Sequence, residues 1–299
     1  MSRIRLPFTA PGIAPAATAS PMPGGLARLF TSGAATPGQV YGAPGQGRST
    51  SISVITTVVL IALWFLITNM GWIKPLFLPT PQAVWNKFVL AMTEGVANST
   101  LLVHAEWSLI RVFGAFALSC VTAIPIGILM GTNRIMRGIF DPPIEFYRPL
   151  PPLAYLPLMI IWFGIGEMSK ILLIFLAIFA PMAISARAGV RSVGIEQIHA
   201  AYAMGSSRMQ IIWHVVLPAA TPEILTGMRI GIGFGWTTLV AAEMVAADKG
   251  LGFMVLNAAQ YLQSDTVIMG IIVIGLFAFA FDLLMRYIER ALVPWKGKA

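Results

Sequence analysis

The chain has 299 residues, of which 57% are hydrophobic and only 11% are charged, and its mean hydropathy is +0.79. A soluble domain carries about a quarter charged residues, so this composition excludes a soluble globular protein and indicates a membrane protein with several spans. The net charge of +8 would suggest nucleic acid binding in a soluble protein, but in a membrane protein it mainly reports which loops carry Lys and Arg.

The first 50 residues hold seven Pro, eight Gly, four Arg and no carboxylate. Such a segment cannot bury enough apolar area to offset its ordering entropy, so we predict a disordered cytoplasmic tail over residues 1–50. Its end, GAPGQGRS, has the spacing of a phosphate loop, but Arg48 stands where the loop needs Lys and no strand precedes it. The three His and the single Cys120 form no metal-binding or disulfide pattern. We therefore expect no cofactor or metal on this chain.

Six runs without charge follow, most of them near the length of a helix that crosses the hydrocarbon layer. They cover residues 49–73, 112–133, 149–166, 171–186, 230–242 and 266–281. Because backbone polar groups in lipid must be paired within the segment, long spans of this kind are helical. The sequence therefore predicts an all-α membrane protein with six transmembrane helices in a single domain, residues 51–299.

The distribution of Lys and Arg predicts the orientation. With the N-terminus in the cytoplasm, cytoplasmic segments hold 13 of the 20 basic residues and external segments hold four, which are Lys74, Lys87, Lys170 and Lys249. Short cytoplasmic loops carry the excess of positive charge in membrane proteins. We therefore expect both termini to be cytoplasmic.

The segment that leads into the third run is unusual because DPPIEFYRPLPPLAYLP places six prolines within sixteen residues. Proline removes a backbone donor and clashes with the preceding turn, so this segment cannot be one regular helix that faces lipid. Asp141 is expected to cap a helix start, with Pro142 in its first turn. A kink required for packing and a segment that lines a water-filled cavity both remain open.

Several charged residues lie at membrane depth, where they are costly and pair with each other, face the bundle interior or mark a substrate route. Structure and pathway both remain open for Glu145 and Arg148, and Asp282 lies near a cytoplasmic end, where we favour a structural role. The candidate translocation path comprises Glu145, Arg148, Arg229, Trp236, Thr237 and Glu243.

Glycines in the fifth run recur on one helix face, at Gly227, Gly231 and Gly235. This spacing lets another helix approach closely, so we predict a tight helix-packing surface. Gly127 and Gly131 repeat the arrangement in the second run.

The loop over residues 187–218 is too apolar and periodic to be a disordered linker. Its pattern predicts a short helix, a sharp reversal at Gly205 and a second short helix, which together lie against the membrane or a partner protein. Thr221, Pro222 and Glu223 then have the order of a cap, a first-turn proline and a first-turn acid, and predict the start of the fifth span.

Within this loop, HAAYAMG, nine residues and VVLP resemble the EAA loop of ABC importer permeases, E-A-A-x-x-x-G-x(9)-I-x-L-P. His199 replaces the family's Glu and Val215 replaces its Ile. The matching positions are His199, Ala200, Ala201, Gly205, Val215, Leu217 and Pro218. In that family the loop is the coupling helix that docks into the separate ATPase subunit.

The resemblance extends over nearly all of residues 51–299. FLPTPQAV, RPLPPLAYLPLMIIWFGIGEMSK, GWTTLVAAEMVAADKGLGFMV and the PWKG ending are similar to the nitrate/sulfonate/taurine branch of these permeases, and within it to taurine permeases. The resemblance implies a type I importer permease with a MetI-like fold, whose core five-helix domain covers about residues 104–288 and whose coupling loop is 187–218.

What the resemblance implies for function is ATP-driven import from the periplasm across the bacterial inner membrane, with taurine as the favoured substrate. Aliphatic sulfonates, nitrate or bicarbonate are the alternatives within the branch. The implied partners are a second copy of the chain, two ATPase subunits that use ATP and Mg, and a periplasmic substrate-binding protein, so the chain itself is not an enzyme. A secondary transporter driven by an ion gradient is the alternative from another class, but it leaves residues 187–218 unexplained.

Overall fold

The computed structural model describes residues 50–293, so residues 1–49 of the predicted tail and the PWKG ending lie outside the described residues. Within that range the chain is helical, and β-pairing is limited to an isolated bridge between Val96 and Ser99. The long helices are α2 (Thr50–Asn69), α4 (Leu101–Thr132), α7 (Glu167–Arg191), α10 (Leu217–Ala246) and α12 (Ser264–Leu292). The shorter ones are α3 (Pro81–Thr93), α5 (Arg134–Tyr147), η1 (Pro152–Tyr155), α6 (Leu156–Phe163), α8 (Ile195–Ala203), α9 (Arg208–Ile211), η2 (Ile212–Val216) and α11 (Leu251–Gln260).

Five helical segments of the described range are long and apolar enough to cross a membrane, and they correspond to five of the six predicted spans. The predicted third span is the exception. The chain there forms α5, a break at residues 148–151, the single turn η1 and the eight-residue α6. This result confirms that the proline-rich segment is not one regular helix.

Two predicted helix starts are wrong. Asp141 does not cap a helix, because α5 already begins at Arg134, where the Asn133 side chain accepts a hydrogen bond from the Ile135 N–H. Pro142 consequently lies inside α5. Thr221 does not cap the fifth span either, because η2 runs directly into α10 at Leu217 and the Thr221 hydroxyl donates to the Leu217 carbonyl.

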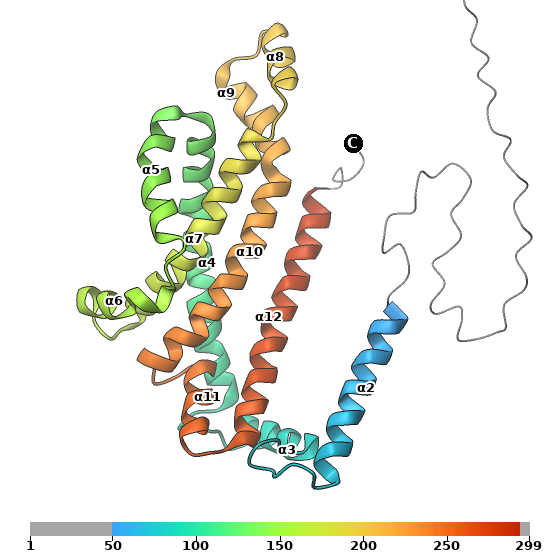
Figure 1. The fold of residues 1–299 in the computed structure, drawn as a ribbon. Coiled ribbons are helices and arrows are strands. Elements are labelled where there is room, and N and C mark those ends of the chain that lie inside the picture. The colour runs from blue at the N-terminus through green and yellow to red at the C-terminus, as the bar shows by residue number, and fades with distance from the viewer. Residues whose placement is uncertain (1–49, 294–299) are drawn as a thin grey trace, which may run out of the picture. The chain divides into compact units, whose positions relative to one another are not determined.

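The core of the bundle is formed by α4, α7 and α10, which lie side by side in Figure 1. Glycines allow these helices to approach closely. A Cβ added at Gly127 of α4 would lie 2.5 Å from the Ala183 carbonyl oxygen of α7. On α10, a Cβ at Gly227 would lie 2.3 Å from the Ser185 Cβ, and one at Gly235 would lie 2.7 Å from the Ile178 Cδ1. The glycine-bearing face of α10 therefore packs against α7.

Glycine at position 227 is expected to be required for this packing. Gly227→Ala forces Ser185 or the α7 backbone to move, and overpacking of this kind costs about 1–3 kcal/mol. We expect a lower midpoint of thermal unfolding for the purified variant in detergent. Gly233→Ala on the same helix is the matched control, because a Cβ there meets no atom within 4 Å. Equal midpoints for the two variants would contradict the packing described here.

Helices α12 and α3 also belong to the bundle. Phe281 of α12 packs against Phe113 and Phe116 of α4, with ring centroids 5.3 and 5.5 Å apart. Helix α3 lies against the start of α12, where Lys87 and Asp265 form an ion pair of 3.9 Å. These contacts place the start of α12 at the same end of the bundle as the start of α4 (Figure 1).

Candidate functional site

The loop between α7 and α10 forms two short helices at the end of the bundle where α4 ends and α5 begins (Figure 1). Helix α8 ends in a left-handed turn: Gly205 has φ +82°, the Gly205 N–H donates to the Tyr202 carbonyl, and the Ser206 N–H donates to the Ala201 carbonyl. These two bonds are those of a Schellman cap, in which glycine is favoured because it adopts positive φ without strain. The predicted reversal at Gly205 is confirmed.

Helix α9 starts immediately after this reversal. The Ser207 hydroxyl accepts from the Gln210 N–H, and the Gln210 side chain accepts from the Ser207 N–H, which together form a capping box. The π-helical segment η2 then joins α9 to α10 without a break. The predicted pair of short helices is therefore present, with the second one continuous with a membrane span.

One face of the loop is anchored to the bundle. Ala201 is buried in an apolar cluster with Val190 of α7 and Ile224 of α10, and Val215 packs against the same cluster. The loop is therefore held in a fixed position at the end of the bundle.

The loop also exposes several large hydrophobic side chains. Met204 is 80% exposed, and Ile195, Tyr202, Met209 and Trp213 are also exposed large hydrophobic side chains. Of the remaining residues that match the EAA pattern, His199, Ala200 and Pro218 are exposed, and Leu217 is half-buried. Because exposed apolar surface is a feature of protein interaction sites, this loop is a candidate for docking a partner.

The candidate path residues occupy different environments. Glu145 and Arg148 lie half-exposed on and just after α5, whereas Trp236 is buried in the main core cluster and Thr237 is exposed. Arg229 forms ion pairs with Asp282 (3.8 Å) and Glu289 (3.4 Å), which join α10 to α12. That these residues line the translocation path remains a prediction.

Glu243 is fully buried and belongs to a network of charges. Its carboxylate accepts from the Arg111 guanidinium at 2.7 Å, from the Ser108 hydroxyl at 2.7 Å and from the Gly252 N–H at 2.9 Å. Arg111 is itself 1% exposed, and its Nε and Nη2 donate to Glu167 at 2.5 and 2.8 Å. The network therefore joins α4, α7, α10 and the start of α11.

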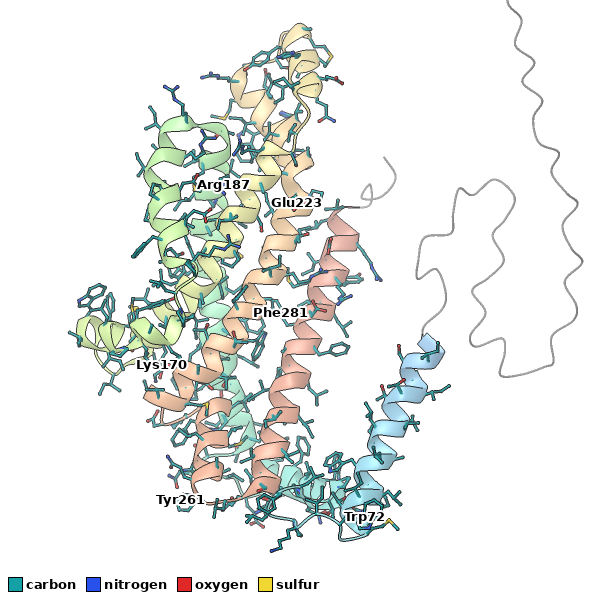
Figure 2. All side chains as sticks on the ribbon, viewed as in Figure 1. Trp72, Lys170, Arg187, Glu223, Tyr261 and Phe281 are labelled. Carbon is teal, nitrogen blue, oxygen red and sulfur yellow. The ribbon has the colours of Figure 1, made fainter. Side chains whose placement is uncertain are left out.

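The network is neutral in total charge and well paired. Lys170 adds a second cation, whose ammonium donates to Glu167 at 2.7 Å. Next to the network, the Gly250 N–H donates to His104 Nδ1. Because Nδ1 accepts this bond, the hydrogen of the neutral imidazole is on Nε2, which donates to the Val96 carbonyl. Figure 2 labels Lys170 and Arg187 near opposite ends of α7, so this network lies in the half of the bundle away from the α8–α9 loop.

This network was not predicted from the sequence. The available signal was that Arg111, Glu167 and Glu243 each stand at or near the edge of an uncharged run at the same end of the bundle. Two acids and a guanidinium at one membrane boundary are expected to pair. Their contacts, however, join positions more than 50 residues apart.

Comparison with known proteins gives one family. Residues 123–294 match the family described as binding-protein-dependent transport system inner membrane component. The chain is 52% identical over 252 residues to the taurine transport system permease protein TauC of Escherichia coli, covering 84% of this chain and 92% of that protein. It is 35% identical to the putative aliphatic sulfonates transport permease protein SsuC of Bacillus subtilis, covering 82% of this chain and 87% of that protein.

A solved structure of the MetNI methionine ABC transporter, in an inward-facing conformation, has a similar fold. The TM-score is 0.55 at 19% identity, over 64% of this chain and 95% of that chain. This likeness concerns the fold, and it identifies the arrangement of helices as that of a MetI-like ABC permease.

Proposed function

The chain belongs to the family of binding-protein-dependent transport system inner membrane components, and from this premise we propose that it is the permease subunit of an ATP-driven importer of taurine. It is a multi-pass permease of the inner membrane in the nitrate/sulfonate/taurine branch, and a transport subunit rather than an enzyme. The observation that carries taurine as the substrate is the 52% identity to the taurine permease over nearly the whole of that protein.

Membership of this family implies an ATPase and a substrate-binding protein as partners. The finer assembly that we propose has two copies of the permease, two ATPase subunits that bind ATP and Mg, and a periplasmic binding protein. The exposed apolar side chains of the α8–α9 loop support ATPase docking, because a separate subunit would cover Met204, Tyr202 and Trp213.

The orientation that we propose has both termini in the cytoplasm. The excess of Lys and Arg on that side supports it. The α8–α9 loop then lies at the cytoplasmic end, where an ATPase can reach it, and the network around Arg111 lies in the periplasmic half.

The mechanism that follows is alternating access. Closure of the ATPase pair on ATP draws the two docked α8–α9 loops together. Because α9 and η2 continue directly into α10, and α7 packs along α10, this movement is transmitted to the spans without a flexible hinge. The charges buried at the opposite side of the bundle keep α4, α7 and α10 together, so these three helices rock as one body and expose the path alternately to the two sides.

Growth on a single sulfur source tests the substrate. A strain that lacks this gene is expected to lose growth on taurine while it retains growth on sulfate. A plasmid copy of the gene restores growth on taurine. If the deleted strain loses growth on an alkanesulfonate and keeps growth on taurine, the substrate is an aliphatic sulfonate and the taurine assignment is wrong.

A further inference from the structure

The ion pair between Glu145 and Arg148 begins at the membrane edge, where Arg187 pairs with both Asp141 and Glu145, and it extends inward to Arg148. Asp141, on the same helix, forms an ion pair with Arg187, which directly follows the uncharged run 171–186 of α7 and therefore marks the membrane edge. From Asp141 to Arg148 the chain advances seven residues, about 10 Å along a helix at 1.5 Å per residue. Because α5 folds back alongside α4, this advance leads away from the cytoplasmic turn and into the membrane (Figure 1).

Both side chains are nevertheless exposed in the isolated chain, 49% for Glu145 and 56% for Arg148. A charged side chain that faces hydrocarbon is costly, so charges at this depth face a water-filled space or another protein surface. The backbone that follows is the proline-rich break at residues 148–151, and irregular backbone at this depth is tolerated where it lines such a space. The exposed charges and the proline-rich break together favour a water-filled space on this side of α5.

The N···O distances around Glu145 and Arg148 are longer than those in the buried network around Arg111. Arg148 Nη1 lies 3.8 Å from Glu145 Oε2, and Arg187 Nη2 lies 3.4 Å from Glu145 Oε1. Good hydrogen bonds between charged groups are about 2.7–2.9 Å long, as around Arg111. Within the described part of the chain, the guanidinium and the carboxylate thus retain hydrogen-bonding capacity for a solute.

Resting on the function proposed above, we propose that Glu145 and Arg148 form a transit site for a small zwitterion. The Arg148 guanidinium receives the sulfonate, because its planar donors match a tetrahedral oxyanion, and the Glu145 carboxylate receives the ammonium. The zwitterion carries no net charge, so its binding leaves the total charge at the site unchanged. A plain anion would meet Arg148 but would be repelled by Glu145, so the site favours the amino sulfonate.

The test uses the whole transporter, with its ATPase and binding protein, in proteoliposomes, and measures taurine imported per ATP hydrolysed. Glu145→Gln and Arg148→Gln are each expected to lower this ratio at least fivefold while ATP hydrolysis and assembly persist. Arg286→Gln is the matched control, since Arg286 is 54% exposed and pairs with an acid one turn away on α12. We expect the control to stay within twofold of the unmodified transporter.

The possible outcomes separate the two proposals. If the unmodified transporter imports no taurine, the proposed function fails. If it imports taurine and both variants keep its ratio, the transit site is wrong although the function stands. If only Arg148→Gln lowers the ratio, the residue serves an anion path and the zwitterion site is overturned. A parallel loss of ATP hydrolysis and uptake in both variants would assign the pair a structural role and also overturn the proposal.

Discussion

Arg111→Met is expected to destabilise the permease strongly, by about 3–5 kcal/mol, because it leaves Glu243 as a fully buried carboxylate without its counter-charge. Glu167 suffers less, since its side chain is 37% exposed and it keeps Lys170. The measurement is the yield and thermal midpoint of the monodisperse protein in detergent.

Two comparisons make this result specific. In the double variant Arg111→Met with Glu243→Met, both buried charges are gone, and we expect most of the stability to return. Arg229→Met is the control for a looser pair: the Arg229 side chain is 36% exposed and its ion pairs measure 3.4 and 3.8 Å, so the cost is about 0–1 kcal/mol. A single variant Arg111→Met with the stability of the unmodified protein would contradict the role assigned to the network.

Gly205→Glu is expected to abolish association with the ATPase while the bundle remains folded. A residue with a Cβ at φ +82° is strained by about 1–2 kcal/mol, so the cap of α8 opens and the exposed Met204 and Tyr202 lose their fixed positions. The fold is spared because a Cβ at Gly205 meets no atom within 4 Å. The measurement is the amount of ATPase that co-purifies with the permease.

The variant Gly205→Asn tests whether the left-handed backbone conformation is required at this position or glycine itself. Asparagine tolerates the left-handed conformation, so this variant is expected to retain most of the ATPase. If Gly205→Glu purifies with a normal amount of ATPase, the loop is not the docking element.

The fold was predictable where the signal is local. Uncharged runs located the five long helices, and six prolines within sixteen residues predicted that the third span is broken. The helix starts were not predictable in this way, because capping residues compete along the chain. Asn133 begins α5 two turns before Asp141, and η2 carries the helix past Thr221.

The candidate sites, like the fold, were predictable where the signal is local and not where it depends on tertiary contacts. The left-handed turn at Gly205 follows from glycine after a short amphipathic segment, and the structure has it. The spacing of Gly227, Gly231 and Gly235 defines a helix face, but only the structure assigns α7 as the neighbour. The pairing of Arg111 with Glu167 and Glu243 depends on tertiary contacts, and no local pattern specifies it.

The most direct test of ATP-driven taurine import is uptake into proteoliposomes that contain the permease and its ATPase, with taurine-loaded binding protein on one side. We predict that taurine accumulates against its gradient only when ATP and Mg are present on the side of the ATPase, and that dissipating ion gradients with ionophores leaves this accumulation unchanged. Uptake that continues without ATP and collapses with the ionophores would contradict the account and would identify a secondary transporter.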